Sequence, residues 1–172
     1  MAKEKKAYFA GGCFWCVEEA FEQTNGVKEV ISGYTGGHIK NPTYEQVSHT
    51  ETGHYEAVEV IYDSEIVTYD QLLDIFWKNI DPYDAQGQFC DKGSSYLSAI
   101  FYQDENELKS IEESKKRLKN VDTASFATHI KKLDIFYNAE DYHQDFYKKN
   151  PIRYKLYKNG CGRVPRLKKI WG

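Results

Sequence analysis

The sequence predicts a two-layer α/β domain in which helices pack on one sheet. Short apolar runs of strand character alternate along the chain with segments whose apolar residues recur at helical spacing. The length of 172 residues suits one domain, and no internal repeat, low-complexity tract or linker divides the chain. We therefore expect a single domain over residues 1–172, with a strand order that these patterns leave open.

The first third of the chain predicts a strand, a helix and a second strand. Residues 7–10 form an apolar run that ends in two glycines, which is typical of a strand entering a sharp turn. Over residues 14–22 apolar side chains recur at helical spacing, with glutamates off that stripe. Residues 27–34 predict the second strand, and a glycine-containing loop then continues to Pro42.

The remaining elements follow the same alternation. Strands are expected at 55–62, 96–102 and 129–137, and helices at 69–80, 104–118 and 140–149. Asp81-Pro82 stops the first of these helices, and the capping-box pair Asp104 and Glu107 opens the second. Residues 84–95 are expected to form a loop. Residues 150–172 show little periodicity, so we expect a C-terminal coil there.

Composition narrows the class of function. The net charge of −3 gives no electrostatic footprint for nucleic acid. Basic residues gather only at the C-terminus, where a solvated tail is the simpler interpretation; they are Arg163, Arg166, Lys168 and Lys169. Aromatic residues are abundant, with 14 Tyr, 9 Phe and 3 Trp, and can line an apolar pocket with a hydrogen-bonding rim.

No targeting or membrane segment is recognisable in the sequence. The apolar stretch near the N-terminus is too short for a signal peptide, and no run of about 18 apolar residues occurs that could span a membrane. We therefore expect a cytoplasmic protein. In a reducing compartment its four cysteines are expected to be thiols or redox-active groups instead of structural bridges.

The sharpest local feature is the run GGCFWC at residues 11–16, which places Cys13 where a strand, a glycine turn and a helix meet. A helix N-terminus offers free N–H groups and partial positive charge, which lower a thiol pKa and favour the nucleophilic thiolate. Cys16 lies one helical turn further in and is expected to be less exposed.

Other interpretations of this cysteine pair stay open. Both cysteines could simply pack, as small buried residues often do. A C-x-x-C pair that opens a helix also suits a general disulfide exchanger. Zinc is a weaker option, because only His49 and His54 could complete such a site and no second cysteine pair is present. A peptide-binding module without catalysis would use the aromatic pocket alone.

Several polar residues could complete a site around Cys13. Strand alternation puts Glu56 on an otherwise apolar face, where desolvation would raise its pKa and let it hold a proton near neutrality. A strand-end glutamate that reaches solvent is the equal alternative. The turn-rich segments 41–44 and 90–96 present Tyr44, Tyr96 and Asp91. The two tyrosine hydroxyls could donate to an oxygen, or all three could be ordinary loop residues.

Two further cysteines lie outside the pair. Cys161 is flanked by glycines, which implies a mobile coil from which its thiol could attack an oxidised Cys13. An idle surface thiol is the alternative for Cys161. Cys90 follows Phe89 in the expected loop, and we interpret its role as structural or incidental.

Taken together, these segments resemble the methionine sulfoxide reductase A family, which reduces the S epimer of methionine sulfoxide. The resemblance covers nearly the whole chain and is carried by GCFWC at 12–16, GYTGG at 33–37, NPTY at 41–44, TGHYEAV at 52–58, DKG at 91–93 with Tyr96, and AEDYHQ at 139–144. So many ordered segments are specific, whereas a lone CFWC would not be. The family fold implied is a two-layer α/β sandwich of ferredoxin-like character with a mixed sheet.

The resemblance also implies roles for the candidate residues. Cys13 corresponds to the nucleophile and Glu56 to the acid that protonates the sulfoxide oxygen. The other roles implied are apolar substrate binding for Phe14 and Trp15, hydroxyl donation for Tyr44 and Tyr96, and polar support for Asp91. Cys13 would become a sulfenic acid, and in many relatives a C-terminal cysteine then forms a disulfide.

The resemblance implies partners as well. The substrate would be methionine S-sulfoxide, free or within peptides and proteins, and thioredoxin would reduce the disulfide, with dithiothreitol as a substitute. No bound cofactor, metal, nucleic acid or membrane is expected, and a monomer is the default. Cys161 lies in the region of the C-terminal resolving cysteine, but Cys16 remains an alternative because relatives often carry a glycine-rich tail that this chain lacks.

Overall fold

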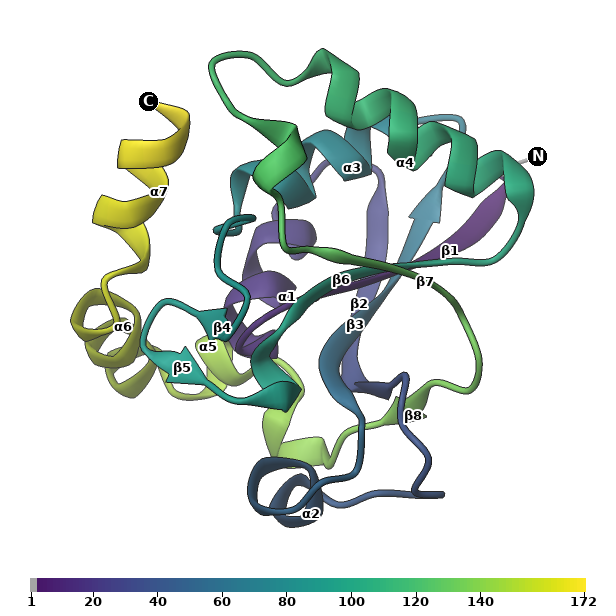
Figure 1. The fold of residues 1–172 in the computed structure, drawn as a ribbon. Helices are drawn as coiled ribbons and strands as arrows, with labels where there is room; N and C mark the ends of the chain where they lie inside the picture. Colours follow the sequence, from purple (N-terminus) through teal and green to yellow (C-terminus); the bar gives the residue numbers. More distant parts are fainter. Residues whose placement is uncertain (1–2) are drawn as a thin grey trace.

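The computed structural model describes residues 3–172, which form a six-stranded mixed sheet in the order β7-β6-β1-β3-β2-β8 (Figure 1). The strands of this sheet are β1 (Glu4–Gly11), β2 (Val27–Thr35), β3 (Tyr55–Asp63), β6 (Ser98–Tyr102), β7 (His129–Lys132) and β8 (Tyr137–Asn138). Neighbouring strands are antiparallel except for β6 and β7, which are parallel. The predicted α/β class with a mixed sheet is confirmed.

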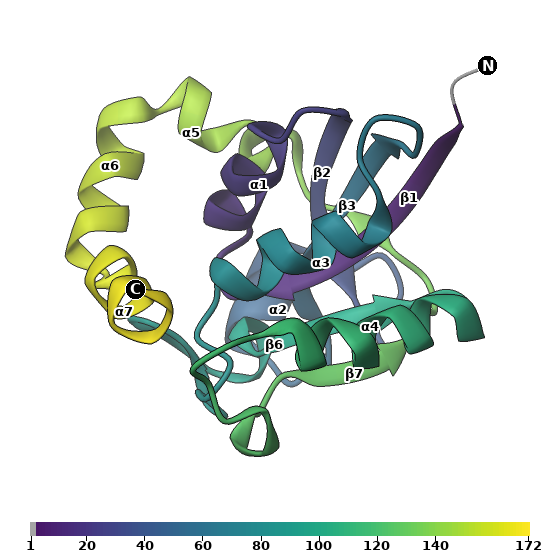
Figure 2. The same ribbon diagram turned by 90° about the horizontal axis from the view of Figure 1, so that it is seen from above.

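Helices cover one face of the sheet and one end of it. They are α1 (Phe14–Glu22), α2 (Tyr44–His49), α3 (Tyr69–Lys78), α4 (Glu105–Arg117), α5 (Phe146–Lys149), α6 (Pro151–Gly160) and α7 (Arg163–Trp171). Figure 2 shows α3 and α4 side by side over the sheet, and α5, α6 and α7 as an arm beside α1. The chain order β1-α1-β2-β3-α3-β6 is the split βαβ arrangement of ferredoxin-like folds.

Helix starts follow the capping chemistry of the sequence. The Asp104 side chain accepts from the backbone N–H of Glu107 at 2.9 Å, which begins α4 where the capping pattern predicted it. Thr68 and Gln71 form a reciprocal capping box at the start of α3. Each cap satisfies backbone N–H groups that would otherwise lack partners, so both helices begin at a fixed residue.

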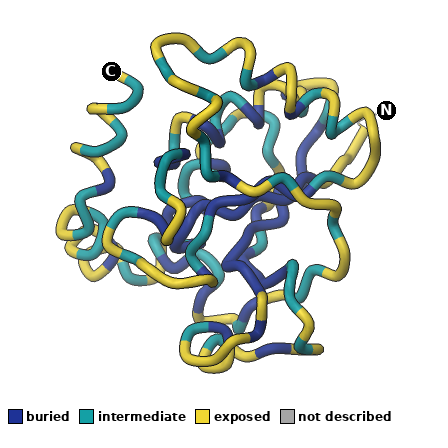
Figure 3. The backbone as a smooth tube through the Cα atoms, viewed as in Figure 1, coloured by how far each residue is buried: buried dark blue, intermediate teal, exposed yellow. Residues whose placement is uncertain are grey.

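The main core lies between the sheet and the pair α1 and α3. Phe9 of β1 stacks between Phe21 and Phe76, with ring centroids 4.9 and 5.1 Å away. Burying one such side chain contributes roughly 1.5–3 kcal/mol. β3 is buried along its whole length, as the dark central segment of Figure 3 shows. On the other face its first residues, Tyr55 and Ala57, belong to a second cluster against which Leu133 and Phe136 pack.

Several segments differ in detail from the predictions, among them the expected helix at 140–149, where a 3-10 turn at Asp141–His143 precedes the short helix α5. The segment after Pro42 contains the short helix α2, and the expected loop at 84–95 contains a two-stranded hairpin, β4 (Gly87–Gln88) with β5 (Asp91–Lys92). The expected strand at 129–137 is two strands, β7 and β8, because the chain leaves one sheet edge and joins the other. These elements are short, and tertiary contacts outweigh the weak local pattern.

The prediction of a solvated C-terminal coil is wrong. Residues from Pro151 onward form α6 and α7, and Arg163 is only 5% exposed. The Arg163 guanidinium donates to the carbonyl of Asn79 at 2.7 Å and to that of Gly11 at 3.1 Å, and Arg166 pairs with Asp81 at 2.9 Å. These basic residues are therefore ligands of backbone and carboxylate oxygens, which ties the C-terminal helices to the end of β1.

The helices within residues 3–172 include none that combines the length and the apolar character needed to cross a bilayer.

The turn at position 12 requires glycine, and a substitution can test this. Its φ is +86°, and a Cβ there would lie 2.6 Å from the Cβ of Gln88. Gln88 cannot easily move, since its side chain bonds both the N–H and the carbonyl of Asp81. We expect Gly12→Ala to lower the free energy of unfolding by about 1–3 kcal/mol in urea titration. Gly160→Ala, where a Cβ meets nothing within 4 Å, is the matched control and should change it by less than about 0.5 kcal/mol.

Candidate active site

Cys13 lies at the junction that the sequence predicted. β1 ends at Gly11, Gly12 turns the chain, and Cys13 is the N-cap residue of α1. The backbone N–H of Cys16 donates to the carbonyl of Cys13 at 3.2 Å, which closes the first turn of the helix. The sulfur of Cys13 therefore projects from the end of the sheet at a helix N-terminus.

A cavity of about 270 Å³ opens over Cys13. Its walls are Cys13, Trp15, Tyr44, Glu56, Asp91, Tyr96, Arg153 and Tyr157. They come from distant parts of the chain: the start of α1, α2, β3, the β4–β5 hairpin with the 3-10 turn Ser94–Tyr96 that follows it, and α6. The predicted residues Cys13, Trp15, Glu56, Tyr44, Tyr96 and Asp91 thus meet around one space.

The two thiols Cys13 and Cys16 are both free and both buried. Burial raises the pKa of Cys13 well above its usual value, and the hydrogen bond to Cys16 raises it further. The same hydrogen bond lowers the pKa of Cys16 to about 6, with Arg163 lowering it further. The expectation of a lowered pKa for Cys13 itself is therefore wrong. The two thiols therefore titrate as one pair, which loses its first proton at about pH 6.

Glu56 is the buried carboxyl group of the cavity. Its side chain is 1% exposed, and its Oε1 accepts from the backbone N–H of Phe14 at 3.3 Å. Its Oε2 is buried without a hydrogen-bond partner. Burial raises the pKa of Glu56 to about 8, and the nearby Asp91 carboxylate adds to the rise. A proton is therefore held on this group at neutral pH, beside the Cys13 sulfur.

Hydroxyl groups surround the rest of the cavity. Burial raises the pKa values of Tyr44 and Tyr96, and the charge of Glu56 raises both further, so both stay protonated as donors. Tyr157 of α6 donates to Asp91, whose pKa is raised by burial. Uncharged O–H groups of this kind can hold an oxygen of a ligand without adding charge.

Trp15 forms the aromatic wall. Its indole stacks on Phe146 with centroids 3.8 Å apart, and its Nε1 donates to Nδ1 of His143 at 3.1 Å. Burial lowers the pKa of His143 to about 4, so the ring stays neutral and accepts this bond. Phe14 does not line the cavity; it lies behind the wall, packed on His143 and Tyr44.

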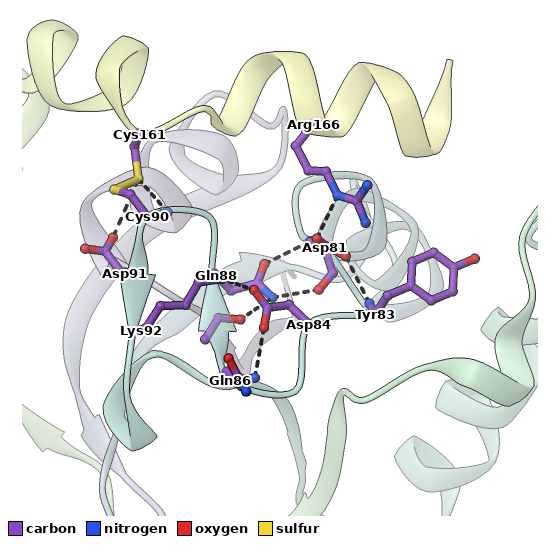
Figure 4. Close-up of polar contacts among 11 residues, drawn as sticks. Asp81, Tyr83, Asp84, Gln86, Gln88, Cys90, Asp91, Lys92, Cys161 and Arg166 are labelled. Atoms are coloured by element: carbon purple, nitrogen blue, oxygen red, sulfur yellow. Dashed lines mark hydrogen bonds and ion pairs between the residues drawn. A yellow bond between two sulfur atoms is a disulfide. The ribbon is translucent and has the colours of Figure 1, made fainter.

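Cys161 is bonded to Cys90 instead of being free to reach Cys13 (Figure 4). The Cys161 sulfur lies 4.0 Å from Oδ2 of Asp91 and 3.8 Å from the Tyr157 hydroxyl. Both of those groups also line the cavity over Cys13. Cys90 is therefore not an incidental thiol, since it forms a disulfide that adjoins the site, and its side chain is exposed.

Of the two histidines named as possible zinc ligands, His54 holds the loop after β2. His54 Nδ1 accepts from the backbone N–H of Gly37 at 3.1 Å, and its Nε2 bonds the carbonyl of Ile39 at 2.7 Å. Both ring nitrogens are thus engaged away from Cys13. The ring holds the glycine-rich loop that precedes α2, and so contributes to the placement of Tyr44.

Three residues at the site were not singled out in the sequence. Tyr157 and Arg153 come from α6, which was expected to be coil, so no pattern placed them near Cys13. His143 belongs to the segment 139–144 that contributes to the family resemblance, but the sequence around it does not predict a role for its side chain. Its contact with Trp15 depends on a fold in which positions 128 residues apart meet.

Comparisons with known proteins agree on one family. The family model described as peptide methionine sulfoxide reductase matches residues 5–172. The peptide methionine sulfoxide reductase MsrA of Bacillus subtilis (strain 168) is 48% identical over 172 residues, which cover 99% of this chain and 97% of that relative.

Solved structures share the fold. The reduced form of Mxr1 from Saccharomyces cerevisiae superposes with a TM-score of 0.81 at 29% identity, covering 87% of each chain. Mxr1 in complex with Trx2 superposes with a TM-score of 0.58 at 23% identity, covering 84% of this chain and 85% of that one.

Proposed function

We propose that Cys13 is the nucleophile and Glu56 the proton donor of this chain, which belongs to the peptide methionine sulfoxide reductase family and reduces methionine sulfoxide to methionine. One observation carries this proposal. A carboxyl group with an unpartnered oxygen and a proton held at neutral pH lines the same cavity as the Cys13 sulfur.

The chemistry needs both groups at once. A sulfoxide oxygen is a poor leaving group until it gains a proton. In the proposed step the Cys13 thiolate attacks the sulfoxide sulfur, Glu56 gives its proton to the oxygen, and the oxygen passes to the Cys13 sulfur. Methionine leaves reduced by two electrons, and Cys13 becomes a sulfenic acid oxidised by two. Cys16, which shares a hydrogen bond with Cys13, is the nearest acceptor for the thiol proton.

The remaining cavity residues bind and orient the substrate in this proposal. Tyr44 and Tyr96 donate to the sulfoxide oxygen, and Asp91 holds Tyr157 at the entrance. Trp15 receives the methyl group of the substrate, and Phe14 supports that wall from behind through Tyr44 and His143.

Recycling of Cys13 is assigned to the other cysteines. We propose that Cys161 takes part as the partner of Cys90, and that an external dithiol protein of the thioredoxin class reduces their disulfide. The structure of Mxr1 with Trx2 supports this choice of reductant. Cys90 is exposed, which gives such a protein access to the bond. No bound cofactor takes part, since the electrons come from thiols throughout.

Removing the aromatic wall should weaken substrate use. Trp15→Ala deletes the ring that faces the cavity, and we expect kcat/KM for an N-acetyl methionine sulfoxide to fall about 10- to 100-fold, mainly through KM. Trp15→Phe keeps an apolar ring and should recover most of that loss. An unchanged KM in the Trp15→Ala enzyme would show that the indole does not bind the substrate.

The reaction itself is tested with separated epimers. The purified protein is given methionine S-sulfoxide or R-sulfoxide with dithiothreitol, and methionine is measured by chromatography. We expect the S epimer to be consumed and the R epimer to remain. Consumption of both epimers at equal rates would contradict a cavity in which Glu56 and Trp15 fix the oxygen and methyl group on opposite sides.

A further inference from the structure

The charge of the C-terminal arm, residues 146–172, differs from that of the rest of the chain. These residues include Lys and Arg but no Asp or Glu, although the whole chain has a net charge of −3. Some cations of the arm have a carboxylate partner on α1. Lys158 pairs with Glu19 at 2.8 Å, and Lys148 pairs with Glu22 at 3.1 Å. The cations without such a partner are therefore the ones that a ligand can use.

Arg153 is an exposed cation of this arm, and it lines the cavity over Cys13. Within residues 3–172 its guanidinium forms no ion pair. The other side chains that line the cavity are acidic or neutral, so Arg153 is the cation of this part of the described structure. An unpaired guanidinium at the mouth of a cavity is placed to bind an anionic group of a ligand.

Helical spacing places Arg153 on the cavity side of α6. Tyr157 lies one helical turn further along the same face and also lines the cavity. Tyr154 is 2% exposed and donates to Glu19 at 3.1 Å, which holds α6 against α1. Lys155 is exposed and does not line the cavity. The packing of α6 therefore directs Arg153 toward the site and leaves Lys155 in solvent.

An aromatic pair supports the Arg153 side chain. Its guanidinium carbon lies 5.9 Å from the centroid of the Phe146 ring, and Phe146 stacks on Trp15 with centroids 3.8 Å apart. The electron-rich face of an aromatic ring attracts a cation within about 6 Å. The guanidinium is therefore held beside the wall that receives the substrate methyl group in the proposed function.

The depth of the cavity determines which part of a substrate meets Arg153. Cys13 and Glu56 are 6% and 1% exposed, whereas Arg153 is exposed. The side chain of methionine sulfoxide is short, so its own carboxyl group and the adjacent residues of a peptide stay at the mouth when its sulfur meets Cys13. The Asp91 carboxylate lines the same cavity and by itself would repel a carboxylate of the substrate. Arg153 offsets this repulsion.

We propose that Arg153 binds a carboxylate next to the methionine sulfoxide side chain, so that the enzyme prefers acidic substrates. This rests on the proposed function, because it requires the sulfoxide to enter the cavity over Cys13. A guanidinium presents paired N–H donors that match the two oxygens of a carboxylate. That carboxylate is the α-carboxylate of the methionine sulfoxide itself or the side chain of an adjacent Asp or Glu. Arg153 does not take part in the chemical step and acts as a specificity residue.

Two matched pairs of substrates test the preference and separate its sources. N-acetyl methionine S-sulfoxide is compared with its amide, which lacks only the α-carboxylate. A short blocked peptide with glutamate after the methionine S-sulfoxide is compared with the same peptide carrying glutamine there. With dithiothreitol as reductant, we expect kcat/KM for the acidic member to exceed that for the neutral member by about 3- to 5-fold, mainly through KM. The pair that shows this ratio identifies the source of the carboxylate.

Variants of α6 assign the preference to one side chain. In Arg153→Gln the ratio of kcat/KM between acidic and neutral members should fall to about 1 or below, because the Asp91 charge is then unopposed. The ratio is taken within one variant, so a general loss of activity cancels. Arg153→Lys keeps the charge without the paired donors and should keep part of the preference. Lys155→Gln removes the same charge from the same helix, away from the cavity, and should leave the ratio unchanged.

Salt provides a second measurement. Raising NaCl from about 0.05 M to about 0.5 M should lower the ratio in the unmodified protein and leave it near 1 in Arg153→Gln, because screening acts on the charge pair. Equal use of both members of each pair by the unmodified protein would overturn the proposal. So would an equal fall of the ratio in Arg153→Gln and Lys155→Gln, which would assign the preference to the overall charge of the arm. In both cases reduction of the neutral substrates continues, whereas failure of the proposed function would abolish the reduction of every substrate.

Discussion

The Cys13→Ser variant should lose at least about 10⁴-fold in kcat/KM with methionine S-sulfoxide, which places it at the background of the assay. Serine keeps the size of the side chain, but its hydroxyl does not ionise near neutrality and cannot be oxidised to a sulfenic acid. The Phe14 N–H bond to Glu56 and the cavity walls remain in this variant. The loss is therefore chemical and not structural.

Two measurements distinguish a chemical loss of activity from a structural one. The free energy of unfolding of Cys13→Ser, from urea titration, should stay within about 1 kcal/mol of that of the unmodified protein, because the substitution changes one buried atom. The Cys90→Ser/Cys161→Ser variant, which also loses cysteines, should still form one methionine per chain without reductant. Methionine formation by Cys13→Ser at more than trace rates would assign the nucleophile to another residue.

The parts of the fold that the sequence predicts well are the long, periodic elements. α1, α3, β3 and α4 begin and end close to the predicted positions, because caps, stop signals and apolar periodicity agree there, whereas β1 begins three residues before the predicted run at 7–10. α6 and α7 were missed because their inward side chains are few and include Arg163, which local patterns mark as a surface residue. Its burial depends on the carbonyls of Gly11 and Asn79, which only the fold brings near.

The site residues also differ in whether local sequence or the overall fold places them. Cys13 was singled out because a glycine turn before a helix is a local feature, whereas the strand pattern left Glu56 open and the family resemblance selected it. Tyr157 lacks such a feature and reaches the cavity through the position of α6. The ionisation of Cys13 was misjudged for a related reason: the helix N-terminus is visible in sequence, but the burial that opposes it is not. The Cys90–Cys161 disulfide joins positions 71 residues apart and likewise has no local pattern.

Glu56→Gln should lower the rate of the attack step by about 10²- to 10⁴-fold, the usual contribution of a positioned general acid. Glutamine has the same shape and can still accept from the Phe14 N–H, so the cavity is kept. It has no proton to give to the sulfoxide oxygen. Methionine formation in a rapid-quench single turnover measures this step apart from disulfide recycling.

The pH dependence identifies the proton donor more specifically than the rate does. The active form has Glu56 protonated and the cysteine pair singly ionised. In the unmodified protein the rate of attack should therefore rise through about pH 6, where the pair loses its first proton, and fall as Glu56 loses its proton through about pH 8. Glu56→Gln should lose the fall at high pH and keep the rise at low pH.

The pH dependence of the free energy of unfolding is a second test of the proton on Glu56. The pKa of Glu56 is raised from its ordinary value of 4.5 to about 8 on folding, so its contribution is fully present below pH 4.5 and is lost as the pH rises toward 8. The unmodified protein should lose stability over that window, and Glu56→Gln should lose less of it, since Glu18, also raised to about 8, still titrates. If urea titrations of the two proteins show the same slope with pH, Glu56 does not carry a buried proton. A solvated carboxylate at this position could not serve as the acid that the sulfoxide oxygen requires.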